Sequence, residues 1–344
     1  MNSHEIERAK KFTYVFIALS VFILMVVPFI RDLHKKDYVF TKLQMGTIVE
    51  ITLKKDDRIS ANKAFEEIDR LEKIFSSYID TSDITRINTN AGGEPVKVSP
   101  EVIEVLLEAK RISELSGGAF DITMGAMGGL WKITEGGEVP PRSEVEKRLK
   151  FVDYKDVIID EYSGRVKLRK EGMRIYLGGI SKGYIVGKAI EVLKSRGVSW
   201  GMVHAGGDMF LFNNPKESKV KKHFNIGIQH PRDGAQIIAS IKVREGAVST
   251  SGDYERFFEQ DGIRYHHILD PETGYPATRS QSVTVVTSNP MLADALSTAV
   301  FVMGADKGIK MVENIKGVEA LVIDSNGNIQ NSMGLEFKTG DAVN

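Results

Sequence analysis

The stretch YERFFEQDGIRYHHIL, residues 254–269, carries the strongest local fold signal of the chain. Two runs rich in aromatic and apolar residues flank Asp261-Gly262. An Asp-Gly pair between such runs favours the tight turn of an antiparallel hairpin. The pattern therefore predicts one strand over 254–260 and a second over 263–269.

Outward from this hairpin, strand and helix patterns alternate irregularly. Predicted strands cover residues 45–53, 157–160, 165–169, 173–177, 209–212, 224–228, 237–243, 283–287 and 318–323, with a short one at Val203. Predicted helices cover residues 59–75, 100–115, 182–196 and 291–303, with a short one after the capping-box pattern at 143–146. Because no regular βαβ alternation exists, we expect an α+β fold with a mainly antiparallel sheet core and flanking helices.

Composition excludes several classes of protein. The 344 residues include 46 Lys plus Arg and 46 Asp plus Glu, which gives a formal net charge of zero. A protein that binds nucleic acid normally needs a basic excess, so we expect no nucleic-acid partner. The chain has no cysteine, which excludes disulfides, Cys-ligated zinc, iron–sulfur clusters and thiol nucleophiles.

Residues 12–30, FTYVFIALSVFILMVVPFI, contain no charged side chain. Nineteen residues are enough for a helix to cross a hydrocarbon core of roughly 30 Å. This predicts an uncleaved transmembrane anchor. A signal peptide is the first alternative, although it needs small residues at a cleavage site, and a buried core helix is the second. Basic residues flank both ends, so charge does not decide orientation.

The predicted organisation is therefore simple. A short tail covers residues 1–11, the anchor 12–30, a linker and domain entry 31–44, and a single catalytic domain 45–340.

A glycine-rich turn, LGGISKG at residues 177–183, lies between a predicted strand and a predicted helix. Such a turn lets a ligand approach the backbone, and the free N–H groups of a helix start favour an anion such as phosphate. It also spells G-x-S-x-G, the nucleophile elbow of α/β-hydrolases. Against that alternative, no parallel sheet is predicted around it, and the HGGG-like string HAGG at 204–207 follows the serine. An ordinary strand-to-helix turn also remains open.

Two further segments carry candidate chemistry. In ADALSTA, residues 293–299, Asp294 and Thr298 are four apart and share one helix face. Their hard oxygen atoms suit Mg²⁺, although an acid in a first helical turn is often only structural. His266 and His267 point to opposite faces of a strand, which argues against a two-histidine metal site. One of them can act as a general base, while the other is structural.

In their order along the chain, these segments resemble the ApbE family of FAD:protein FMN transferases. The resemblance rests on short blocks at residues 45–47, 77–78, 82–84, 87–88, 118–121 with Trp131, 177–184, 205–208, 226–231, 250–256, 267–271 with 273–274, and 293–299. Each block is short, but together they run along nearly the whole chain after the predicted anchor.

The resemblance implies a reaction in which the FMN half of FAD is transferred, with Mg²⁺, to a threonine or serine hydroxyl of a target flavoprotein, releasing AMP. It implies metal contacts from the side chains of Asp294 and Thr298, with the backbone carbonyl of Ser181 and with Ser297 close by. Implied flavin or adenine contacts are Met45, Tyr78, Ala119, Phe120, Asp121, Gly178, Tyr184 and Ile268. We expect His267 to be the base, supported by Asp253 and Arg256.

Three positions depart from the family pattern: Tyr176 and Gly187 stand where many relatives carry aspartate, and His204 stands where asparagine is usual. Many relatives are lipoproteins with an N-terminal cysteine, whereas here the anchor would take that part. The resemblance then implies a single-pass protein of a bacterial cytoplasmic membrane with an extracytoplasmic catalytic domain. Two alternatives stay open: an FAD pyrophosphatase that uses water in the same site, and an FAD-binding protein without turnover.

Overall fold

The computed structural model describes residues 37–133, 137–213 and 223–340. The predicted anchor, residues 12–30, lies outside these ranges. Within them, no helix is both long enough and apolar enough to span a bilayer.

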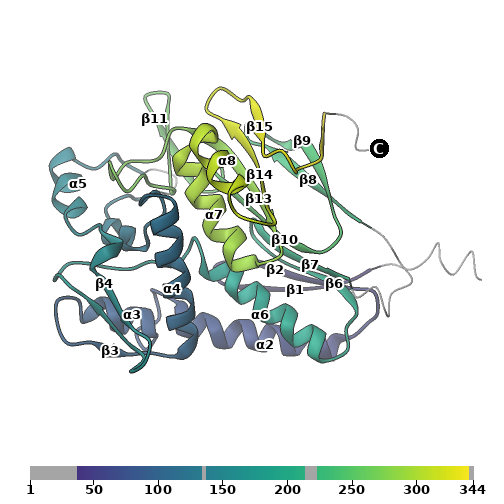
Figure 1. Ribbon diagram of the computed structural model, residues 1–344, viewed down its shortest axis with the longest axis horizontal. Helices are drawn as coiled ribbons and strands as arrows, with labels where there is room; N and C mark the ends of the chain where they lie inside the picture. The colour runs from purple at the N-terminus through teal and green to yellow at the C-terminus, as the bar shows by residue number, and fades with distance from the viewer. Residues whose placement is uncertain (1–36, 134–136, 214–222, 341–344) are drawn as a thin grey trace, which may run out of the picture.

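The centre of the fold is an eight-stranded sheet in the order β1-β2-β6-β7-β10-β13-β14-β15 (Figure 1). Each pair of neighbours is antiparallel. The strands are β1 (Tyr38–Gln44), β2 (Thr47–Leu53), β6 (Trp200–Ala205), β7 (Asp208–Asn213), β10 (Gly246–Gly252), β13 (Ser280–Thr287), β14 (Val318–Asp324) and β15 (Ile329–Asn331). The predicted α+β class with an antiparallel sheet is confirmed.

Strand β1 lies in the segment before Met45. Residues 31–44 were expected to be a linker and the entry to the domain, and within them Tyr38–Gln44 pairs with β2 along its whole length. Gln44 is buried at the end of β1, where its Nε2 donates a 2.9 Å hydrogen bond to the carbonyl oxygen of Phe65. A tight turn follows, with φ of +53° at Met45 and +69° at Gly46. The folded unit therefore begins one strand before Met45.

Helices cover one face of this sheet and enclose the main hydrophobic core. They are α2 (Arg58–Phe75), α3 (Asp83–Thr89), α4 (Pro100–Leu115), α6 (Ser181–Ser195), α7 (Pro290–Met303) and α8 (Ala305–Glu313). Helix α6 packs against both α2 and α7, and Figure 1 shows α2 and α6 at the lower side of the view with α7 above them. Helices α6 and α7 approach closely because Gly183 lies against α7: a Cβ added there would be 2.2 Å from the carbonyl oxygen of Pro290.

The opposite face is covered by a three-stranded sheet in the order β16-β9-β8, with its own apolar cluster. Its strands are β8 (Phe224–His230), β9 (Asp233–Val243) and β16 (Phe337–Thr339). A third small sheet comprises β3 (Val96–Lys97), β5 (Arg165–Leu168) and β4 (Val157–Asp160).

The predicted hairpin is confirmed, although its strands are shorter: β11 (Phe257–Gln260) pairs with β12 (Ile263–His266). It lies at the same end of the molecule as α5 (Arg142–Leu149) (Figure 1). Its aromatic side chains join a satellite cluster around Trp131, whose ring stacks 5.9 Å from that of Tyr265.

Two local predictions were wrong. Residues 173–177 are extended but belong to no strand, because the Asn88 side chain takes the place of a neighbouring strand. It accepts from the Ile175 N–H at 2.7 Å and donates to the Ile175 carbonyl at 3.0 Å. Helix α5 begins after Pro141, so Ser143 lies inside the helix and no side chain caps it. Strands β1 and β10 and helices α3 and α8 were not predicted.

Candidate active site

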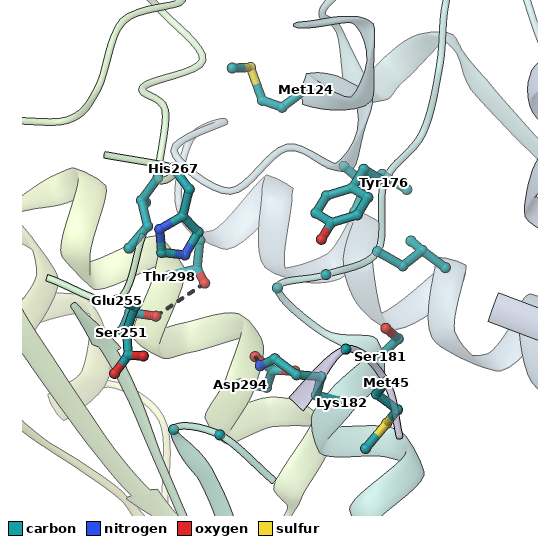
Figure 2. Close-up of a pocket in the computed structure, with 18 of the residues that line it drawn as sticks. Met45, Met124, Tyr176, Ser181, Lys182, Ser251, Glu255, His267, Asp294 and Thr298 are labelled. Atoms are coloured by element: carbon teal, nitrogen blue, oxygen red, sulfur yellow. Dashed lines mark hydrogen bonds and ion pairs between the residues drawn. The ribbon is translucent and has the colours of Figure 1, made fainter. Parts of the chain in front are cut away.

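A cavity of about 580 Å³ opens between the N-terminal ends of α6 and α7 and the segments before and after the β11–β12 hairpin. Figure 2 shows His267 on one side, Tyr176 on the other, and Asp294 with Lys182 at the base. The β1–β2 turn, the end of α2 and the glycine turn at 177–179 complete the wall. Segments far apart in sequence thus meet at one point.

The base of the cavity holds two acids and one lysine. Asp294 is buried, and its Oδ2 accepts a 2.9 Å hydrogen bond from the Gly183 N–H. The ammonium of Lys182 lies 3.6 Å from Asp294 Oδ1 and is hydrogen bonded to Asp208. Burial raises the pKa of Asp294, and the neighbouring Asp208 carboxylate raises it further. Burial lowers the pKa of Lys182, but the two carboxylates outweigh it and raise that pKa.

Hydroxyl groups line the adjoining surface. Thr298 lies one turn after Asp294 on α7, and its Oγ1 is 3.3 Å from the Ser251 Oγ of β10 (Figure 2). The Ser251 Oγ is also 2.8 Å from that of Ser297, which is fully buried and donates to the Asp294 carbonyl at 2.8 Å. Thr298 therefore faces the cavity, whereas Ser297 lies behind it.

This donor set fits a hard divalent cation that also binds substrate oxygens. Among the residues that the structure describes, no group of three or more His, Cys, Asp or Glu side chains could hold a metal by itself. Asp294 and Thr298 offer a carboxylate and a hydroxyl, and Ser181 lines the same cavity. Two buried carboxylates share a single ammonium here, so a second positive charge would be favourable. Mg²⁺ is typically held in this way, by few carboxylates plus substrate phosphates.

The two histidines of the hairpin have different surroundings, as predicted. His266 is buried, its Nε2 is 2.8 Å from the Ala277 carbonyl oxygen, and its ring meets Phe301 edge-on. His267 lines the cavity. Burial, followed by the charge of Arg256, lowers the pKa of His267 to about 3, so the ring is neutral at neutral pH. Its Nδ1 is buried without a hydrogen-bond partner within the described ranges.

Most of the other residues implied by the resemblance also line the cavity. They are Met45, Tyr78, Ala119, Phe120, Asp121, Gly178, Arg256 and Ile268. The Asp121 carboxylate is already engaged, because it accepts from the backbone N–H groups of Thr123 and Tyr154 at 2.7 and 2.9 Å. Burial raises its pKa. Asp121 thus shapes the wall through its own backbone contacts.

Besides Ser297, two of the expected residues do not line the cavity. Asp253 is buried, and its carboxylate accepts two 2.7 Å hydrogen bonds from the Arg232 guanidinium. Tyr184 donates a 2.7 Å hydrogen bond to Glu104, and its ring meets Phe75 edge-on at 5.5 Å. Since Phe75 does line the cavity, Tyr184 supports the wall from behind.

The family model described as "ApbE family" matches residues 45–322, a range that contains every cavity-lining residue. The chain belongs to the ApbE family. A curated relative from Klebsiella pneumoniae (strain 342), an FAD:protein FMN transferase, is 32% identical over 295 residues, which cover 85% of this chain and 90% of the relative. Another from Treponema pallidum (strain Nichols), with the same name, is 32% identical over 318 residues and covers 87% and 88% of the two chains.

Solved structures of ApbE proteins share the fold. The crystal structure of the ApbE protein from Thermotoga maritima has a TM-score of 0.79 and 37% identity, and the match covers 87% of this chain and 97% of that one. The flavin transferase ApbE from Vibrio cholerae has a TM-score of 0.75 and 27% identity over the same share of each chain.

Sequence reasoning assigned no role to several residues that line this ApbE cavity, namely Lys182, Ser251, Glu255, Met124 and Tyr176, nor to Asp208, which pairs with Lys182. Lys182 and Asp208 each lie in a segment that carried the resemblance, yet their pairing spans 26 positions. No local pattern indicates it. The one available signal was a lysine directly after the serine of a glycine turn, where a phosphate-binding cation is common.

Proposed function

We propose that this protein is an FAD:protein FMN transferase, which moves the FMN half of FAD onto a threonine or serine hydroxyl of a target flavoprotein. The observation that carries this proposal is that one cavity contains both a charged Lys182–Asp294 pair and a histidine, His267. The Lys182–Asp294 pair can bind phosphate and metal, and the imidazole of His267 lines the same cavity.

In this reaction the acceptor hydroxyl oxygen attacks the phosphorus nearer the riboflavin. A new P–O bond forms to the acceptor, the P–O bond to the AMP phosphate breaks, and AMP leaves. The hydroxyl proton passes to the imidazole of His267. Phosphoryl transfer depends mostly on positioning and charge neutralisation, and Lys182 supplies one fixed positive charge for the phosphates.

We propose Mg²⁺ as the metal, held by the Asp294 carboxylate, the Thr298 hydroxyl and the Ser181 carbonyl. When bound, it would neutralise negative charge on the pyrophosphate. The protein's own part is to keep these oxygen atoms in place: Asp294 through the Gly183 N–H, and Thr298 through its position one turn further along α7.

The nucleophile-elbow alternative at Ser181 lacks its structural context. An elbow needs a strand that leads into the serine turn, whereas residues 173–177 form no strand and the surrounding sheet is antiparallel. Ser181 therefore serves as the first residue of α6 and not as a nucleophile.

The proposed function is tested by incubating the protein with FAD, Mg²⁺ and candidate flavoproteins. Intact mass spectrometry and chromatography then follow the acceptor and the nucleotide. We expect an FMN-sized adduct on a threonine or serine and one AMP per adduct. Free FMN with an unmodified acceptor would indicate a pyrophosphatase instead, and bound FAD without AMP would indicate a binding protein.

We also propose that residues 12–30 anchor the chain in a bacterial cytoplasmic membrane, with the catalytic domain on the extracytoplasmic side. The uncharged run of that segment supports the anchor. Deletion of residues 1–36 should release the protein from the membrane fraction. Protease added to intact spheroplasts should degrade the catalytic domain. Protection of the domain from the protease would show that it lies on the cytoplasmic side instead.

A further inference from the structure

Tyr176 is a cavity residue that neither the mechanism nor the family resemblance uses. Its position is one where many relatives carry aspartate. The side chain lines the cavity and is 41% exposed. A half-exposed aromatic ring in a ligand cavity is apolar surface that a ligand could cover.

The backbone that carries Tyr176 is held firmly. Its N–H donates a 2.8 Å hydrogen bond to the Ile122 carbonyl. The preceding residue, Ile175, is held on both sides by the Asn88 side chain. The ring therefore projects from a fixed point of the wall.

Gly178 makes room for this ring. A Cβ added at Gly178 would lie 2.4 Å from three atoms of Tyr176: Cε1, Cζ and Oη. Gly178 does not have a positive φ, so a side chain there would meet the Tyr176 ring rather than backbone strain. The Tyr176 ring thus lies over the glycine turn that leads to Ser181 and Lys182.

Exposed aromatic rings are few in the cavity. Phe75 and Phe120 line it but are 5% and 4% exposed, whereas Tyr78 and Tyr176 are 85% and 41% exposed. FAD also carries two planar ring systems, isoalloxazine and adenine, one on each side of its pyrophosphate. Stacking on an aromatic face suits any planar heteroaromatic ring.

We propose that Tyr176 is a stacking platform for one of the two planar rings of FAD. The proposal rests on the proposed function for its ligand. The ring covers one face of the bound heterocycle, while Lys182 and Asp294 lie at the base of the same cavity. Figure 2 shows Tyr176 on the side away from His267, which leaves the acceptor's approach free.

The test measures affinity by titration calorimetry, with EDTA present so that no turnover occurs. Tyr176→Ala should weaken FAD binding by about 5- to 100-fold, the range of a lost base–aromatic stack. Tyr176→Phe should bind FAD within about twofold of wild type, because it keeps the aromatic face. Tyr162→Ala is the matched control, since Tyr162 is fully exposed and lies outside the cavity. It should leave the affinity unchanged.

Titrations with FMN and with AMP identify the ring. Weaker binding of FMN but not AMP to Tyr176→Ala assigns the isoalloxazine, and weaker binding of AMP but not FMN assigns adenine. Either result supports the platform. Unchanged affinity for all three ligands, or an equal loss in Tyr176→Phe, would overturn it. Transfer of FMN by the wild-type enzyme is scored separately, so the proposed function can fail while the platform stands.

A double-mutant cycle tests the packing of the ring on the turn. Gly178→Ala should weaken FAD binding because its Cβ displaces the Tyr176 ring. In the Tyr176→Ala background the same change should cost much less, because residues in contact are not additive. Fully additive losses would contradict the packing. Thermal unfolding of each variant shows whether the fold is intact.

Discussion

Two parts of the cavity differ in how their polar groups are hydrogen bonded. We call the part around Lys182 and Asp294 the α6–α7 wall, and the part around His267 the hairpin wall. On the α6–α7 wall, the Asp294 carboxylate accepts from a backbone N–H, and Lys182 is paired with two acids. On the hairpin wall, His267 Nδ1 is buried without a partner among the described residues. A satisfied network is fixed before the ligand arrives, whereas an unpartnered group gains its partner from the ligand. Under the proposed function, the first wall would hold FAD and the second would meet the acceptor hydroxyl.

The largest effect is expected on the α6–α7 wall. Asp294→Ala should lower metal-dependent AMP release by about 1,000-fold or more, because a metal supplies several kcal/mol of charge stabilisation. AMP is measured by chromatography in the presence of FAD, acceptor and Mg²⁺. Asp306→Ala, at an exposed acid in the first turn of α8, is the control and should keep full activity. Undiminished AMP release in Asp294→Ala would contradict the assignment of Asp294 as a Mg²⁺ ligand.

A change on the hairpin wall should separate rate from affinity. His267→Ala should slow FMN transfer by about 100-fold, the lower end of general-base catalysis. The dissociation constant for FAD should stay within about threefold of wild type, since the imidazole acts on the acceptor. Single-turnover transfer and FAD titration give the two numbers. Equal losses in both would make His267 only a binding residue.

The close approach of α6 and α7 can be tested through stability. In Gly183→Ala, the new Cβ would meet the Pro290 carbonyl oxygen at 2.2 Å and the Asp294 Cβ at 2.8 Å. Overpacking of this kind typically costs about 1–3 kcal/mol of folding free energy. Urea unfolding should show this loss, and AMP release should fall with it because Asp294 moves. If the variant were as stable as wild type, α7 would be able to move away from the new Cβ at little cost, and the close packing of α6 and α7 would not be rigid.

A pH dependence of stability is also expected from His267. The folded-state pKa of His267, about 3, lies below its unfolded value, so between these values the unfolded state binds more protons. The free energy of unfolding should therefore fall as pH decreases from about 6.5, by up to about 1.4 kcal/mol per pH unit from this one group. His267→Gln should reduce that slope. An identical slope in the variant would contradict the buried neutral ring.

Local sequence patterns correctly predicted the features of the fold that are set by residues close together in the sequence. The i, i+4 spacing of Asp294 and Thr298 correctly placed both on one face of α7, and Asp261-Gly262 correctly placed the hairpin turn. Helix α6 ends at Ser195, close to the predicted end at residue 196, and Gly197 follows with φ of +80°. These features need only short-range geometry.

Long-range pairing explains what the sequence could not reveal. The Lys182–Asp208 contact joins a helix to a strand, and Asn88 reaches Ile175 across 87 positions, which removes an expected strand. Asp253 was expected to support His267 because it lies in the block at 250–256 that carried the resemblance. Its partner Arg232 lies in another hairpin and turns its carboxylate away.

The most direct test of the two-wall account compares Mg²⁺-dependent FAD affinity in wild type, Asp294→Ala and His267→Ala. The account predicts that Mg²⁺ tightens FAD binding in wild type and in His267→Ala, and that Asp294→Ala loses this effect. An equal response to Mg²⁺ in all three proteins, or its loss in His267→Ala alone, would contradict the claim that Asp294, and not His267, takes part in Mg²⁺-dependent FAD binding.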